Sequence, residues 1–171
     1  MAFKKVYSEV PACSQGHTSN DTLACASCGM MHVGSHMKLY VPEDQPVPVA
    51  SEASSNKIEL GQEVTVKVTY DAEIEKEKLQ VIVGHGLEVV STEAAAEVAT
   101  VKVTAKEPIF GHRTVIVDYM GVRRMFMLDL VPATVDGVGI SEIKVEPAVA
   151  EAGKEAVITV TLTEKAAGAE A

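Results

Sequence analysis

The sequence is poor in aromatic residues, which limits the composition of any core. It also lacks long apolar runs, which argues against a membrane span. Tryptophan is absent and aromatics make up 4% of the 171 residues, although 47% are hydrophobic. Any core must therefore be built from Val, Ile, Leu, Met and Ala, a composition that favours strands. No stretch approaches the roughly 18 consecutive apolar residues that span a bilayer, so we expect no membrane span. Glu9 and Pro11 fall where a secretory signal would place its apolar run, so we expect an untargeted N-terminus.

Basic residues and cysteines are also few. The chain has 15 Lys and Arg against 24 Asp and Glu, a formal net charge of -9. Proteins that bind a phosphate backbone concentrate Lys and Arg on one face, so we expect no nucleic-acid partner. The three cysteines are an odd number and all lie within the first 28 residues, which favours a reducing compartment. We expect a cytoplasmic protein or, as the alternative, one that is exported together with a partner.

Alternating apolar and polar residues predict strands and no long helix through the middle of the chain. Val64, Val66 and Val68 alternate with polar residues, as in a half-buried strand. A tight turn at Met120-Gly121 joins two further strands, 114–119 and 124–130. Strands at such short intervals are typical of two packed antiparallel sheets.

Two segments carry a recognisable frame. Gly61 to Thr69 reads Gly-x-x-Val-Thr-Val-x-Val-Thr, and Gly111 to Val117 reads Gly-x-x-Thr-Val-x-Val. They resemble the immunoglobulin-like modules of bacteria and archaea. The resemblance implies an all-β, immunoglobulin-like antiparallel β-sandwich over residues 58–132. It covers about half of the chain and implies a fold class rather than a chemistry.

Three other segments accompany the predicted sandwich. Residues 1–40 form an irregular Cys/His/Met-rich arm, and residues 41–57 are a Pro-rich linker or edge segment. Residues 133–171 form a C-terminal β-hairpin extension and tail, whose strands repeat the opening pattern of the sandwich. A lone hairpin is marginal in water. We expect it either to fold back on the sandwich or to add to the edge of another protein subunit by strand augmentation through 140–163.

The arm contains the residues most suited to chemistry. Cys25 and Cys28 form a Cys-x-x-Cys pair, and the full candidate metal-ligand set is Cys13, His17, Cys25, Cys28, His32 and His36. Three thiolates and one imidazole can bind zinc at about 2.3 Å per sulfur. The fourth ligand is open among the histidines and another subunit.

The metal itself is also open at this stage. The same donors can hold an iron–sulfur cluster, and Met30, Met31 and Met37 add thioethers suited to copper. Were the chain helical after Cys25, then Cys28, His32 and His36 would share one face. The remaining readings are a redox dithiol and an arm whose cysteines bind nothing.

Together these patterns predict an accessory, non-catalytic subunit of a larger protein complex, redox or otherwise. It would bind a metal or iron–sulfur cluster through its arm and dock through its sandwich. No Ser, His and carboxylate spacing suggests nucleophilic catalysis and no phosphate loop is present, so we expect no independent enzymatic activity. The alternatives are a purely structural or scaffold module without a cofactor and a copper-handling protein.

Overall fold

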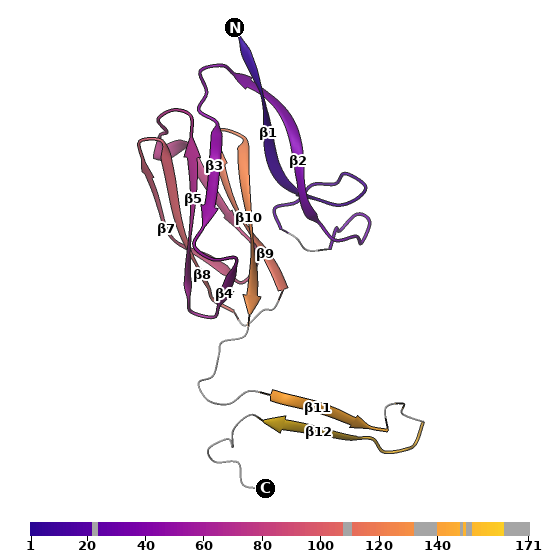
Figure 1. Ribbon diagram of the computed structural model, residues 1–171. Helices are drawn as coiled ribbons and strands as arrows, with labels where there is room; N and C mark the ends of the chain where they lie inside the picture. Colours follow the sequence, from indigo (N-terminus) through magenta and orange to yellow (C-terminus); the bar gives the residue numbers. More distant parts are fainter. Residues whose placement is uncertain (22–23, 108–110, 132–139, 148, 150–151, 163–171) are drawn as a thin grey trace. The chain divides into compact units, whose positions relative to one another are not determined.

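A computed structural model shows that the chain folds into strands (Figure 1). The structure describes residues 1–21, 24–107, 111–131, 140–147, 149 and 152–162. The strands are β1 (Phe3–Ala12), β2 (Val33–Pro42), β3 (Pro48–Ala53), β4 (Lys57–Glu59), β5 (Glu63–Tyr70), β6 (Leu79–Val83), β7 (Leu87–Ala95), β8 (Val98–Ala105), β9 (Gly111–Tyr119), β10 (Val122–Val131), β11 (Ile140–Glu146) and β12 (Val157–Leu162). A short 3₁₀ turn, η1 (Lys76–Lys78), precedes β6. The prediction of an all-β chain is confirmed.

The chain divides into two compact units, Met1–Pro132 and Ala133–Ala171. The first contains β1 to β10 and the second contains the β11–β12 hairpin. The predicted tail beyond Leu162 lies outside the described residues. Within the described ranges, no helix has the length and apolar character needed to cross a bilayer.

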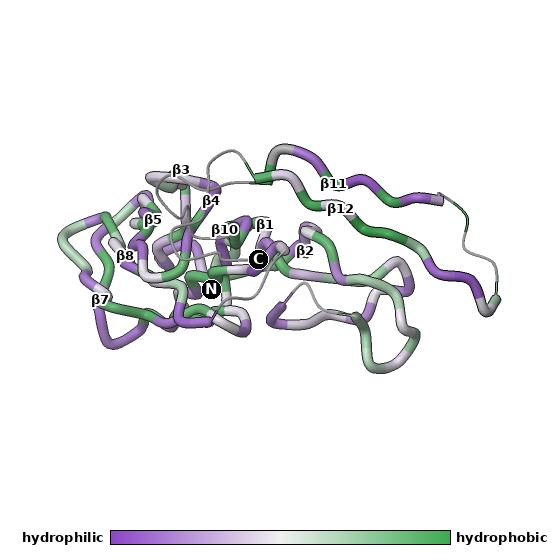
Figure 2. The backbone as a smooth tube through the Cα atoms, turned by 90° about the horizontal axis from the view of Figure 1, so that it is seen from below, coloured by the Kyte–Doolittle hydropathy of each residue, from purple (hydrophilic) through white to green (hydrophobic). Residues whose placement is uncertain are grey.

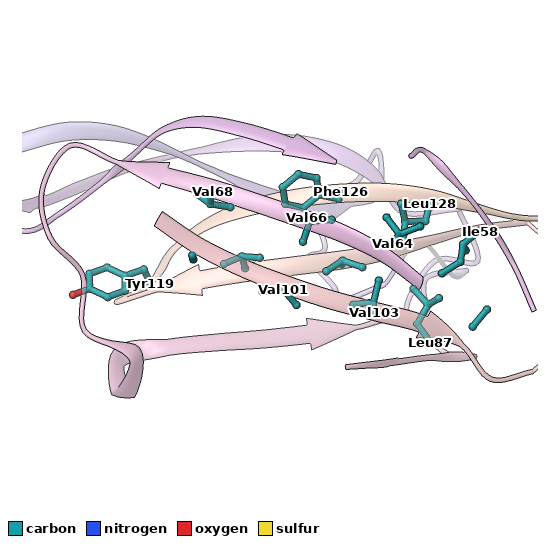
Figure 3. Packing of buried hydrophobic residues seen from close by; sticks show 14 of the residues in the cluster. Ile58, Val64, Val66, Val68, Leu87, Val101, Val103, Tyr119, Phe126 and Leu128 are labelled. Atoms are coloured by element: carbon teal, nitrogen blue, oxygen red, sulfur yellow. The ribbon is translucent and has the colours of Figure 1, made fainter. Parts of the chain in front are cut away.

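Two four-stranded sheets enclose the core of the first unit. Their strand orders are β3-β5-β8-β7 and β4-β10-β9-β6, with β4 parallel to β10. Residues from both sheets point into one shared apolar cluster, which Figure 3 shows from close by. Val66 and Val101 from one sheet and Val115 and Leu128 from the other are fully buried. The alternation read from the sequence is therefore what positions this core.

The β9–β10 hairpin matches its prediction closely. Tyr119 pairs with Val122 across a two-residue turn. Met120 has φ +51° and Gly121 has φ +87°, the pair of positive angles that lets a tight turn follow the twist of its strands. This hairpin also carries, on β10, the contacts to the N-terminal segment.

The N-terminal arm differs from the irregular segment that we expected. β1 and β2 form a ladder of ten residue pairs, from Phe3 opposite Pro42 to Ala12 opposite Val33. The alternation in β2 is masked by Gly34, Ser35 and polar neighbours, so only the long-range pairing of the two segments defines the strands. The part of the arm between them holds the cysteines.

β1 lies along the edge of the sandwich at β10 (Figure 1). The backbone N–H of Arg123 donates to Ser8 Oγ at 2.9 Å, and that of Met125 donates to Glu9 Oε2 at 2.8 Å. These side chains satisfy amide groups that an open edge would present to another chain. The hairpin therefore covers this edge and is fixed to it.

Asp71 provides a second attachment of β1. Its carboxylate accepts the backbone N–H of Val47 at 2.8 Å and contacts Lys4 Nζ at 3.1 Å. Burial alone would raise the pKa of Asp71, but the Val47 amide and the Lys4 ammonium outweigh it and the net effect is a lowered pKa.

A lowered pKa in the folded state makes Asp71 a source of acid sensitivity. Its contribution to stability is fully present above the unfolded value of about 3.9 and is lost as the pH falls through the folded pKa. We expect the free energy of unfolding of the Asp71→Asn variant to fall less than that of the wild type as the pH is lowered from about 6 to about 3. Urea denaturation at each pH measures this, and parallel curves for the two proteins would contradict it.

Candidate metal centre

The first half of the site is a turn that directly follows β1. The backbone N–H of Gly16 donates to the carbonyl oxygen of Cys13, and the N–H of Cys13 donates to the carbonyl oxygen of His17, both at 2.9 Å. Gly16 has φ +83°, a conformation that costs glycine little. The turn reverses the chain and brings His17 back beside Cys13.

The second half is the Cys-x-x-Cys turn. The backbone N–H of Gly29 donates to the carbonyl oxygen of Cys25 at 2.8 Å, and the N–H of Cys25 donates to the carbonyl oxygen of Met30 at 2.7 Å. Gly29 has φ +73° and closes the turn. Both Cys25 and Cys28 are thereby directed to the same side as the first turn.

The two turns bring four ligand atoms together. His17 Nδ1 lies 3.3 Å from Cys13 Sγ and 3.5 Å from Cys25 Sγ. Cys28 Sγ lies 3.6 Å from Cys13 Sγ. All four ligand atoms lie within 4.8 Å of one another. Three sulfurs and one imidazole nitrogen this close form a donor set that could hold a metal ion such as zinc.

The environment of the thiols differs from one to the next. Cys13 and Cys25 are each 5% exposed, whereas Cys28 is exposed. A hydrogen bond from the backbone of Ser27, opposed by burial and helped by Cys28 and His17, lowers the pKa of Cys25 from 9.0 to about 6. The lowered pKa favours the thiolate of Cys25, which is the form that binds metals.

Cys28 shifts in the opposite direction. The backbone hydrogen bond at Met30 alone would lower the pKa of Cys28, but burial and the neighbouring thiols of Cys13 and Cys25 outweigh it and raise the pKa. Three thiols packed together cannot all ionise without a cation between them. A cation among the three sulfurs would relieve this repulsion.

The segment between the two turns is attached to the sandwich. Arg123 Nη1 donates to Asn20 Oδ1 and Thr114 Oγ1 donates to the carbonyl oxygen of Asn20, each at 3.1 Å. The backbone N–H of His85 donates to Asp21 Oδ2 at 3.1 Å. A Cβ on Gly84 would lie 2.7 Å from the Asp21 carboxylate, so glycine permits this close approach.

The other predicted ligands lie elsewhere. His32 is 6% exposed and lines a cavity of about 390 Å³ together with Met31, His112 and Met127. His36 faces Glu9 on the β1–β2 hairpin, with 4.0 Å between Nε2 and Oε1. The helical alternative that would align Cys28, His32 and His36 is wrong, because residues 33–42 form strand β2.

Sequence reasoning did not find the attachment residues. Asn20 and Asp21 contact β9, β10 and the loop at residue 84, which are more than 60 positions away in the chain. The glycine at position 84, before His85 and Gly86, was the one local signal of a close backbone approach. The residue that approaches Gly84, Asp21, is known only from the tertiary structure.

Comparison with known proteins gives only distant likenesses. No protein-family model matches the chain, and no curated protein matches it. Among solved structures, the chain is similar to the S-layer protein SbsC. Against SbsC domains 4 and 5 the identity is 16% over 57% of this chain, with a TM-score of 0.37. Against rSbsC(31-844) it is 12% over 94%, with a TM-score of 0.41. The chain spans 59% and 28% of the lengths of those two structures.

Proposed function

We propose that this protein is a non-catalytic β-sandwich module that binds one zinc ion through Cys13, His17, Cys25 and Cys28. The observation that carries the proposal is the convergence of these four ligand atoms within 4.8 Å. The ion holds the two turns together and, through the attached segment between them, fixes the arm to the sandwich. Zinc in this role is structural, since all four positions are filled by protein ligands.

The spacing of the ligand atoms supports a single ion over a cluster. Around one tetrahedral zinc, with bonds of about 2.0 Å to nitrogen and about 2.3 Å to sulfur, two ligand atoms lie about 3.5 to 3.8 Å apart. The three separations given above, 3.3, 3.5 and 3.6 Å, are close to that range. In an iron–sulfur cluster, thiolates on different irons lie farther apart because the irons stand between them.

Imidazole among thiolates also supports zinc over copper(I). Copper(I) prefers soft sulfur donors, and the only thioether contact described near the site joins Met30 Sδ to the Ser14 hydroxyl. The other two methionines that the sequence offered as copper ligands, Met31 and Met37, are exposed. Copper handling is therefore the weaker alternative.

The strand order supports the immunoglobulin-like assignment. The sheet β3-β5-β8-β7 corresponds to the order A-B-E-D, and β10-β9-β6 corresponds to G-F-C. This fold alone does not define a role. The accessory role within a larger protein assembly is part of the proposal, and the three free thiols at one site support a reducing compartment such as the cytoplasm.

Elemental analysis of protein purified under reducing conditions, together with its absorption spectrum, tests the proposal. We expect about one zinc per chain and no visible absorbance. We expect the Cys25→Ser variant to lose that zinc. The matched control is His36→Ala, which removes a histidine of the arm outside the four-residue group and should retain the metal.

Each contrary outcome is specific. A brown protein that contains iron would indicate an iron–sulfur cluster in place of zinc. It would favour the role of a subunit in a redox complex. Copper in the wild type would favour copper handling. Absence of any metal, or equal zinc in the wild type and in Cys25→Ser, would overturn the proposal and leave the structural module without a cofactor.

A further inference from the structure

The β11–β12 hairpin is amphipathic across its full width. Its cross-strand pairs place six aliphatic residues on one face: Ile140 opposite Leu162, Ile143 opposite Val160, and Val145 opposite Ile158. The register shifts between Ile140 and Glu142, and this bulge returns Ile140 to the same face as Ile143 although three positions separate them. Apolar residues, green in Figure 2, recur along both strands.

The opposite face is polar apart from Val157, which lies opposite Glu146. It carries Glu142, Lys144 and Thr159, and Lys144 Nζ lies 2.8 Å from Glu146 Oε1. The six aliphatic side chains of the other face are 40% to 67% exposed. A two-stranded sheet with an uncovered apolar face is marginal in water, so this face requires a cover.

The first unit shows how an apolar sheet face of this kind is covered in this protein. There β5 presents Val64, Val66 and Val68 in the same alternation, and a second sheet buries them completely. Gly61 before β5 has φ +80° and Gly153 before β12 has φ +77°. The two segments are therefore built alike, and the natural cover for the hairpin is another aliphatic sheet face.

We propose that a second copy of this chain supplies that cover, with two β11–β12 hairpins packed face to face about a two-fold axis. The arrangement buries both apolar faces and leaves both polar faces outward, so it is closed and needs no third component. Each hairpin carries mixed charges, with Glu142, Glu146 and Glu155 against Lys144 and Lys154. Two copies can therefore meet without strong repulsion, despite the chain's net charge of -9.

The outer face of β5 and β8 offers a poorer cover than a second hairpin, because it carries Thr65, Lys67 and Lys102. An aliphatic face gains little by packing on threonine and lysine. This favours the second copy over that face.

The size of the face sets the expected strength. A fully exposed aliphatic side chain offers about 60–120 Å² of apolar surface, so six half-exposed ones in each of two copies bury about 400–700 Å². With the polar rim, the interface reaches about 1,000 Å², near the lower limit for a specific complex. We therefore expect a reversible dimer with a dissociation constant in the micromolar range.

Sedimentation of the full chain between about 1 and 200 µM, with the metal present, tests the proposal across the range that such an interface implies. The wild type should shift from monomer to dimer. Val160→Lys and Ile143→Lys, each placing a charge on the apolar face, should remain monomeric. Thr159→Lys adds the same charge at the neighbouring position on the polar face and should dimerise as the wild type does.

The outcomes separate this interface from others. A wild type that stays monomeric at the highest concentration would overturn the proposal, as would a dimer that survives both apolar-face variants. A dimer that dissociates when the metal is chelated would assign the contact to the arm instead and would also overturn it. The result does not depend on whether the metal is zinc.

Discussion

Chelation of the proposed zinc ion should release the backbone around Cys13, His17, Cys25 and Cys28 while the sandwich stays folded. The Cys13 and Cys25 turns rest on a few local hydrogen bonds and the isolated bridges Ala12–Thr18 and Ala24–Met31. A structural zinc ion supplies about 10 to 16 kcal/mol of apparent binding free energy in small zinc-binding peptides. Removing such an ion leaves these bonds and the contacts of Asn20 and Asp21 with the sandwich to hold the two turns.

Amide hydrogen exchange measures this effect segment by segment. In the metal-free, reduced protein, we expect exchange in residues 13–31 to rise by about 100-fold or more, because these amides then open locally. Amides of β5, β8 and β9 should keep their protection and serve as the internal control. Equal exchange of residues 13–31 with and without metal would contradict a structural role for the ion.

Replacement of a core residue should have the largest effect on global stability. Leu128 on β10 is fully buried between the two sheets. Leu128→Ala leaves a cavity and should lower the free energy of unfolding by about 2 to 5 kcal/mol, as measured by urea denaturation. Met127 on the same strand is 39% exposed. Met127→Ala should therefore change the free energy of unfolding by no more than about 0.5 kcal/mol. Similar losses in the two variants would mean that β10 does not face the core as described.

Local sequence patterns were sufficient to predict the strands and turns that depend on neighbouring residues alone. Alternation at Val64, Val66 and Val68 defines a strand with one buried face, and Met120-Gly121 defines a turn whose positive φ angles the chain can adopt. These elements required no knowledge of distant residues. The same alternation in the C-terminal segment correctly indicated the β11–β12 hairpin.

The elements that were missed depend on long-range contacts. β1 and β2 become strands because they pair with each other across a twenty-residue gap and because Ser8 and Glu9 bond to β10. Neither segment shows an alternation that predicts a strand, so the arm was expected to be irregular.

The sequence offered six candidate ligands, and the structure brings four of them together: Cys13, His17, Cys25 and Cys28. Spacing alone could not choose a fourth ligand among His17, His32 and another subunit. The choice depends on the turn at Gly16, which brings His17 toward the cysteines, and on β2, which carries the chain away from them after His32. Backbone conformation decides such questions, and it is only weakly encoded in the spacing of ligands.

X-ray absorption at the metal edge of the purified protein tests the central claim most directly. One zinc ion bound by Cys13, His17, Cys25 and Cys28 predicts a first shell of three sulfurs at about 2.3 Å and one nitrogen at about 2.0 Å, with no metal neighbour. A shell of oxygen and nitrogen ligands, or a second metal atom at short distance, would contradict the account.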